Sequence, residues 1–166
     1  MKDFKYGWVV CLSFILVGCN TIMLKSASGT DEANAKSFSP DPTRALIYVF
    51  RDDSFLGRDL ASQMVINNIS VTKNEHNQFN VVSVTPGKYD LFSLSLHETS
   101  KLTSLLHNSG KARVSLTVES GKLYFVQEIF KPTTGFYPKV VSAEAAAPII
   151  KKAKFVAQMS LQNPKQ

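Results

Sequence analysis

ALIYVFR, residues 45–51, is the stretch of sequence that decides the fold. It is short, apolar on both faces and built from β-branched and aromatic residues, which favours a buried strand over a helix. Further runs with strand character are residues 64–66, 69–71, 79–84, 89–96, 111–119, 123–130 and 139–141. Together these runs predict a chain made mainly of short β-strands.

The segments between these runs carry residues that favour turns. Asn67-Asn68 predicts a tight hairpin, because asparagine tolerates the left-handed backbone conformation, and Pro86-Gly87 and Ser120-Gly121 mark two more turns. Residues 111–119 alternate strictly between apolar and polar side chains, as in an antiparallel strand with one buried face. The sequence therefore predicts a mostly β fold, an antiparallel β-sandwich of about seven short strands.

A short helix is expected at the C-terminal end of the domain. Ser142 can cap a helix that runs past Lys152, and Pro148 indicates either a kink or a later start. Its apolar stripe would consist of Ile149 or Ile150 together with Ala153 and Val156. We expect the β-sandwich domain to span residues 44–160, with residues 161–166 as a tail.

The aromatic residues of two predicted strands are candidates for the core. We expect Tyr48, Phe50, Tyr124 and Phe125 to pack between the sheets, because each large ring buries about 150–250 Å² of surface. Ligand stacking by these rings is the alternative. Arg51, which ends a hydrophobic strand, is expected to pair with Asp52, Asp53 or Glu128 rather than with a carboxylate ligand.

The N-terminus resembles the signal peptide of a bacterial lipoprotein. Lys2 and Lys5 precede the apolar run Trp8–Val17, which is much shorter than the roughly 20 residues that a membrane-spanning helix needs. Leu16-Val17-Gly18-Cys19 then resembles a lipobox, so residues 1–18 would be removed between Gly18 and Cys19. An ordinary secretory signal with a chance cysteine, or an uncleaved anchor, is the alternative.

The resemblance to a lipobox predicts a lipid on Cys19. Residues 19–43 are rich in small and polar residues, so we expect a lipidated flexible tether there. Asn20 resembles an outer-membrane sorting signal. The expected partner is thus a membrane, reached through the lipid on Cys19, and the expected location is the bacterial cell envelope, on the outer membrane facing the periplasm.

Composition argues against a fold stabilised by disulfides and against a nucleic-acid-binding protein. Removal of residues 1–18 would leave 148 of 166 residues with Cys19 as the one cysteine, so no disulfide could form within the mature chain. The formal net charge of +6 is scattered rather than clustered with aromatic residues, which argues against a nucleic-acid partner.

A search for catalytic and metal-binding motifs finds none. His76, His97 and His107 lie far apart without metal-site spacing, and no nucleophile elbow or phosphate-binding loop occurs. We therefore expect no catalytic residues, no metal and no cofactor. The long connection from His97 to Gly110, with His97, Glu98 and His107, is the candidate contact loop, because loops on rigid sheets carry function. A solvated insertion without function is the alternative.

Three short motifs in a fixed order carry a resemblance to a known family. They are A-x-I-Y-V-[FY]-R at residues 45–51, VTPGKY at residues 84–89 and GKLYFV at residues 121–126. Together they resemble the domain of unknown function 2846 family over roughly residues 35–128, with a longer connection at residues 97–110. The resemblance implies a short bacterial envelope protein with a compact, mostly β domain, and it brings no catalytic residues.

Two classes of function remain open from the sequence. The first is a non-enzymatic envelope module, anchored by lipid, that binds a protein partner or a cell-wall component. The second is a small-ligand carrier or cryptic enzyme with a site between the sheets. A solid core would favour the first class, and a pocket lined by convergent polar groups would favour the second.

Overall fold

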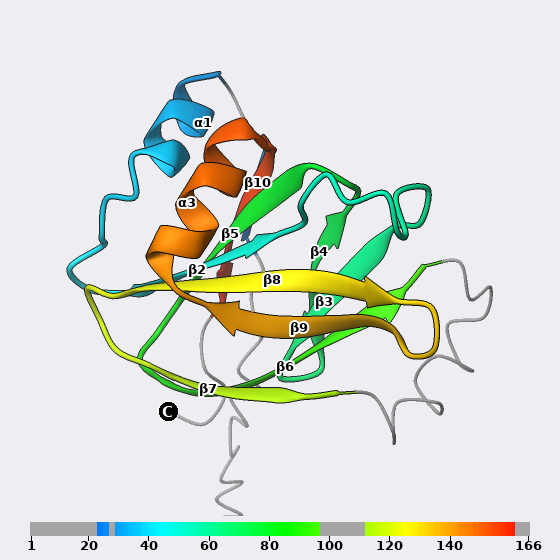
Figure 1. The fold of residues 1–166 in the computed structure, drawn as a ribbon. Coiled ribbons are helices and arrows are strands. Elements are labelled where there is room, and N and C mark those ends of the chain that lie inside the picture. Colours follow the sequence, from blue (N-terminus) through cyan, green and yellow to red (C-terminus); the bar gives the residue numbers. More distant parts are fainter. Residues whose placement is uncertain (1–22, 27–28, 97–111, 162–166) are drawn as a thin grey trace, which may run out of the picture.

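A computed structural model describes residues 23–26, 29–96 and 112–161, and it shows two β-sheets lying face to face (Figure 1). The larger sheet has the order β1 (Met23–Ser26), β10 (Lys154–Leu161), β5 (Gln78–Val84), β2 (Ala45–Phe50), β8 (Leu123–Lys131) and β9 (Gly135–Val141). The smaller sheet has the order β4 (Ile69–Asn74), β3 (Ser62–Ile66), β6 (Gly87–Ser95) and β7 (Val114–Val118). The predicted mostly β sandwich is confirmed, with ten strands in the described residues instead of about seven.

The larger sheet is mixed, whereas the prediction had every strand antiparallel. β2 runs antiparallel to β5 but parallel to β8, and β10 runs parallel to β5. Parallel neighbours require a crossover connection. The chain makes one crossover through the smaller sheet between β2 and β8, and another through helix α3 (Ala143–Lys152) between β9 and β10. The smaller sheet is antiparallel throughout.

Strand β2 is buried on both faces, and this explains its unbroken apolar sequence. Alternate residues face the smaller sheet, namely Ala45, Ile47 and Val49. The residues between them face the helices α1 (Gly29–Lys36) and α3, namely Leu46, Tyr48 and Phe50. Figure 1 shows both helices on the same side of the larger sheet. The domain therefore has three layers, with an apolar layer on each face of β2.

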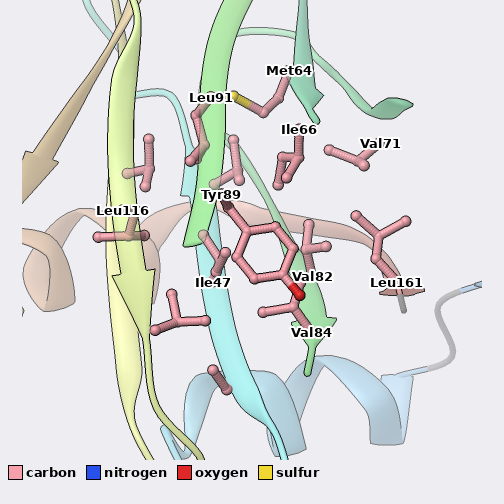
Figure 2. Packing of buried hydrophobic residues seen from close by; sticks show 14 residues of the cluster. Ile47, Met64, Ile66, Val71, Val82, Val84, Tyr89, Leu91, Leu116 and Leu161 are labelled. Carbon is pink, nitrogen blue, oxygen red and sulfur yellow. The ribbon is translucent and has the colours of Figure 1, made fainter. Parts of the chain in front are cut away.

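The sequence predicted that Tyr48, Phe50, Tyr124 and Phe125 form the core between the sheets, and this prediction is wrong. Tyr48, Phe50 and Phe125 lie in the layer beneath the helices, where the Tyr48 and Phe125 rings stack 5.2 Å apart. Tyr124 is only partly buried against the edge of the core between the sheets. That core is mainly aliphatic, with Tyr89 as its one aromatic residue (Figure 2).

The prediction of a flexible tether over residues 19–43 is wrong for much of that range. β1 pairs with β10, and α1 packs on the aromatic layer, where Tyr48 Oη donates to the Ala35 carbonyl oxygen at 2.9 Å. The Phe38 ring lies 5.3 Å from the Tyr48 ring. Strand pairing, aromatic contacts and a hydrogen bond to Tyr48 hold parts of a segment whose average composition indicates disorder. Residues 19–22 lie outside the described part of the chain.

Helix α3 begins directly after Ser142, the earlier of the two starts that the sequence left open. The Ser142 hydroxyl accepts a hydrogen bond from the Ala145 amide at 3.4 Å, and Pro148 lies within the helix. The helix ends at Lys152, however, so Val156 belongs to β10 and not to a helical stripe. Leu161, predicted to begin a tail, is buried and accepts a hydrogen bond from Arg44 Nη2 at 2.6 Å. None of the described helices is long and apolar enough to span a membrane.

Candidate functional site

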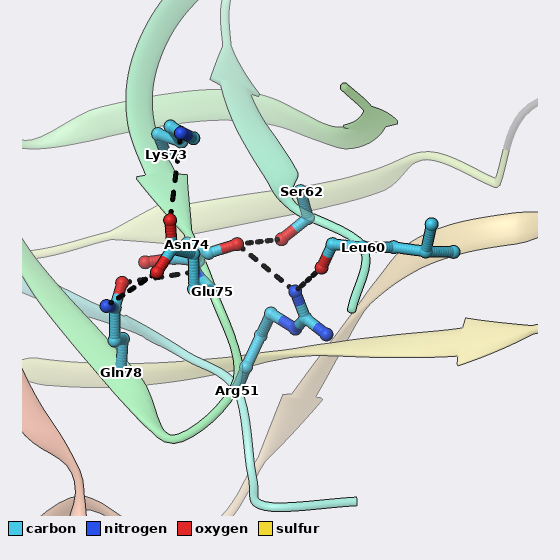
Figure 3. Close-up of polar contacts among 7 residues, drawn as sticks. All are labelled: Arg51, Leu60, Ser62, Lys73, Asn74, Glu75 and Gln78. Carbon is cyan, nitrogen blue, oxygen red and sulfur yellow. Dashed lines mark hydrogen bonds and ion pairs between the residues drawn. The ribbon is translucent and has the colours of Figure 1, made fainter. Parts of the chain in front are cut away.

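Arg51 leaves the end of β2 and points into the space between the two sheets. Its side chain is almost fully buried, with 3% of its surface exposed. Nη1 donates to the carbonyl oxygens of Leu60 at 2.6 Å and Asn74 at 3.1 Å (Figure 3), and Nη2 donates to the Gly57 carbonyl oxygen at 2.7 Å. The guanidinium also lies over the Phe136 ring, 4.4 Å from its centroid. Arg51 thus joins two loop carbonyls to the end of β4.

Glu128 comes from β8 and lies in the same space, with 2% of its surface exposed. Its Oε2 accepts hydrogen bonds from Ser62 Oγ at 2.9 Å and Asn74 Nδ2 at 2.5 Å. Burial raises the pKa of the Glu128 carboxyl, although the side chains of Asn74, Ser93 and Ser62 and the charge of Arg51 act in the opposite direction. Within the described residues, nothing donates a hydrogen bond to Glu128 Oε1.

Asn74 is the centre of this buried polar group. Its Nδ2 also contacts Thr72 Oγ1 at 3.1 Å, and its Oδ1 accepts a hydrogen bond from the Asn80 amide. The group therefore brings together residues of β3, β4, β5, β6 and β8 and the residue after β2 at one end of the space between the sheets. We call this group the polar end; it consists of Arg51, Ser62, Thr72, Asn74, Asn80, Ser93 and Glu128.

The prediction that Arg51 pairs with a neighbouring carboxylate is wrong in its contacts. In the described part of the chain, Asp53 pairs with Arg58 at 2.6 Å, and Asp52 accepts a hydrogen bond from Gln127 Nε2 at 3.1 Å. Glu128 is close enough to Arg51 to act on its pKa, since burial lowers that pKa and the charge of Glu128 raises it. The guanidinium hydrogens are directed at backbone carbonyls instead.

Two of those carbonyls, of Gly57 and Leu60, belong to the connection between β2 and β3, residues 51–61. Gly57 has a φ of +74°, and a Cβ atom there would lie 2.6 Å from the Phe130 ring, so this position requires glycine. The two residues before it are the most exposed large apolar residues described, with Phe55 86% and Leu56 55% exposed. A buried arginine thus fixes a loop that presents two apolar side chains to solvent.

A cavity of about 180 Å³ lies beneath this loop. Its lining includes Arg51, Asp52, Leu56, Glu128 and Phe136. A second hollow of about 240 Å³ lies beside α1 and is lined in part by Asn34, Tyr48 and Gln158. Both volumes are below the roughly 300–1,000 Å³ of typical small-molecule sites.

Most of the residues predicted as sites lie outside the described residues. These are Gly18, Cys19, His97, Glu98 and His107. His76 is described and lies exposed between β4 and β5. Within the described residues, no group of three or more histidine, cysteine, aspartate or glutamate side chains could hold a metal ion.

Sequence reasoning missed Asn74 and the other polar partners of Glu128. These residues are separated by tens of positions and meet only through the strand registers. An arginine directly after an apolar strand was the one available signal.

Fold and site together define a small two-sheet β domain whose polar end fixes a surface loop. The chain belongs to the family described as "Protein of unknown function (DUF2846)", which matches residues 41–138. This match confirms the resemblance found in the sequence, and it includes Arg51, Asn74 and Glu128 but not α3 or β10. No curated protein and no solved structure gave a significant match to the chain.

Proposed function

We propose that the protein is a bacterial envelope lipoprotein with a non-enzymatic binding domain. It is processed between Gly18 and Cys19 and anchored by lipid on Cys19, on the outer membrane facing the periplasm. The support is the order of a charged start, a short apolar run and the Leu16–Cys19 motif. The domain then binds a protein partner or a cell-wall component.

One observation carries the choice of a binding domain. Most of the space between the sheets holds packed aliphatic side chains and the polar end, while the loop fixed by Arg51 presents Phe55 and Leu56 to solvent. Exposed apolar side chains on a rigid support favour recognition at the surface. The predicted contact loop over residues 97–110 lies outside the described residues and remains part of this proposal.

A small-ligand carrier or cryptic enzyme is the second candidate. It is favoured by the cavity of about 180 Å³ next to Arg51 and Glu128, because Glu128 Oε1 has no hydrogen-bond donor among the described residues. A ligand there would have to be small and carry a hydrogen-bond donor. The small volume of the cavity makes a small-ligand carrier or enzyme the weaker of the two candidates.

The anchor is tested by replacing Cys19. We expect Cys19→Ala to accumulate as an uncleaved precursor without lipid, while the unchanged protein shows globomycin-sensitive processing and the mass of an acylated N-terminus. A mature species that begins at another residue would contradict the lipoprotein proposal.

The binding function is tested by affinity capture. The lipidated protein, tagged at its C-terminus and kept at native level, is recovered from gently solubilised envelopes after brief cross-linking. A reproducible protein partner supports the proposal. Recovery of the protein alone would contradict protein binding and leave cell-wall, lipid or small-ligand binding to be tested.

A further inference from the structure

The loop of residues 51–61 carries an unusual pair of exposed apolar side chains. Only four large apolar residues are exposed in the described part of the chain: Phe55, Leu56, Leu96 and Val140. Phe55 and Leu56 are adjacent and are the most exposed of the four. We call this pair the apolar tip. Single exposed apolar residues need no explanation, but a contiguous pair at a loop apex is typical of contact sites.

The apolar tip is held in place from inside the domain. Arg51 binds the carbonyl oxygens of Gly57 and Leu60, which follow the tip, and the Leu60 amide donates to the Gly57 carbonyl oxygen at 3.1 Å. Arg58 and Asp53 pair across the loop at 2.6 Å. A loop fixed before binding loses less conformational entropy when it binds, so apolar side chains on it contribute more to affinity.

The charge around the apolar tip is negative, although the chain as a whole has a net charge of +6. Residues 52–59 contain three aspartates (Asp52, Asp53 and Asp59) and one arginine. An anionic lipid surface would repel this loop, and so would the same loop of a second copy. A surface with a positively charged rim would attract it.

The apolar tip and the start of the described chain lie at opposite ends of the larger sheet. β1 begins at Met23, which pairs with Ser160, and Leu161 pairs with Val84 at the end of β5. The loop starts after Phe50, which pairs with Phe79 at the beginning of β5. Seven residues of strand separate these ends by about 20 Å.

The position of the apolar tip relative to the membrane follows if the lipid is on Cys19, and this step rests on the proposed function. Cys19 precedes Met23 by four residues, and four residues of chain reach at most about 14 Å. The anchor would therefore hold the Val84 end of the domain near the membrane. The apolar tip would point away from that membrane, toward the periplasmic space.

We propose that Phe55 and Leu56 are the docking tip for a protein partner that presents an apolar pocket with a basic rim. The pocket receives the two side chains, and the rim faces the aspartates around them. The cavity lined by Leu56, Phe130 and Phe136 lies next to the apolar tip, so a bound partner would also cover its opening.

The test places a photoreactive amino acid at exposed Ser54 in the full-length, lipidated protein in cells. The same probe at Val140, 42% exposed on β9, is the control position. We expect a discrete protein adduct from position 54 and at least tenfold less from position 140. The double variant Phe55→Ser, Leu56→Ser should lose the position-54 adduct at least tenfold, with an unchanged thermal midpoint because both side chains are exposed.

Charge is tested by a matched pair of reversals. Asp59→Lys, beside the apolar tip, should weaken the adduct several-fold. Glu119→Lys, at another exposed acidic residue in the distant turn between β7 and β8, should leave the adduct unchanged.

Several results would overturn the docking tip. An adduct to lipid or to a second copy of this chain would do so, as would an adduct that survives Phe55→Ser, Leu56→Ser. In that last case affinity capture would still recover a partner, so the proposed function would stand while the docking tip would not. Loss of partner capture together with every adduct would reject both the docking tip and protein binding as the proposed function.

Discussion

The space between the two sheets contains two regions of opposite character. Around Ile47 and Ile66 this space holds a packed, mainly aliphatic core. Arg51, four residues after Ile47, lies in the same space beside Asn74 and Glu128. The first region, which we call the apolar core, supplies non-directional stabilisation in proportion to buried area. The polar end supplies directional interactions, because the hydrogen bonds of Arg51 are made to particular backbone carbonyl oxygens.

The difference follows from what each region has to hold. Strands satisfy their own backbone groups through the sheet, so apolar side chains are sufficient between them. A loop has fewer backbone partners, and the buried guanidinium of Arg51 supplies donors to the carbonyls of Gly57 and Leu60. Burying charge is costly unless hydrogen bonds compensate. We infer that the polar end is retained because it fixes the loop of the apolar tip.

The largest expected effect comes from removing the buried arginine. Arg51→Met keeps the bulk of the side chain, but it removes one donor from each of three carbonyls and removes the positive charge near Glu128. We expect the free energy of unfolding to fall by about 3–5 kcal/mol, the range for breaking a buried charged contact. Urea denaturation measures it, and a loss below about 1 kcal/mol would show that the polar end is not required.

The second effect is a pH dependence from Glu128. Because burial raises the pKa of this carboxyl in the folded protein above its ordinary 4.5, the folded state holds the proton more tightly than the unfolded state. The stabilisation from this proton is complete below the unfolded pKa and is lost as pH rises through the folded pKa. The slope reaches at most about 1.4 kcal/mol per pH unit.

Glu128→Gln isolates this contribution, since the amide keeps the shape and does not titrate. The difference in unfolding free energy, unchanged protein minus variant, should fall as pH rises from about 4.5 through the folded pKa. Denaturation at a series of pH values gives that difference. Parallel curves for the two proteins, or a difference that rises with pH, would contradict the raised pKa.

A smaller change is expected when the apolar core is trimmed by one methyl group. Ile47→Val leaves a small cavity and should lower the free energy of unfolding by about 0.5–1.5 kcal/mol. Loop geometry should not change, because Ile47 packs in the apolar core while Arg51 makes the hydrogen bonds to the loop. Urea denaturation together with the amide chemical shifts of residues 53–60 checks both statements; shifts as large as those in Arg51→Met would remove the distinction between the two regions.

The smallest effect on stability is expected at the apolar tip. Phe55→Ser changes a side chain that is 86% exposed, so the free energy of unfolding should stay within about 0.5 kcal/mol of the original value. Thermal and urea denaturation measure it. A loss above about 1 kcal/mol would mean that Phe55 belongs to the folded core of the domain and is not free to bind a partner.

Local patterns in the sequence predicted much of the fold. The apolar run at residues 45–51 and the alternation at residues 111–119 correspond to strands, and Ser142 caps α3 as expected. Asn67 and Asn68 adopt positive φ in the β3–β4 hairpin. In each case the deciding interactions lie within a few residues of one another, and such interactions are visible in a sequence.

Long-range pairing explains what the sequence did not reveal. β10 follows a helix and looks like its continuation, and only pairing with β5 and β1 makes it a strand. The aromatic residues of β2 lie beneath the helices because α1 covers that face, which composition did not indicate. Asn74 and Glu128 come close to Arg51 only through the sheet registers. Sequence reasoning therefore named Glu128 only as one of three possible partners of Arg51, and it missed the carbonyl contacts.

Amide hydrogen exchange in the loop tests the central claim most directly. The amides of Arg58 and Leu60 donate within the loop, to the carbonyl oxygens of Phe55 at 3.3 Å and Gly57 at 3.1 Å. Their protection is compared in Arg51→Met and in Ile66→Ala, a variant of the apolar core with an expected loss of about 2–5 kcal/mol. We predict that only Arg51→Met removes the loop protection. Equal protection in both variants, or equal loss in both, would contradict the claim that the polar end holds the apolar tip.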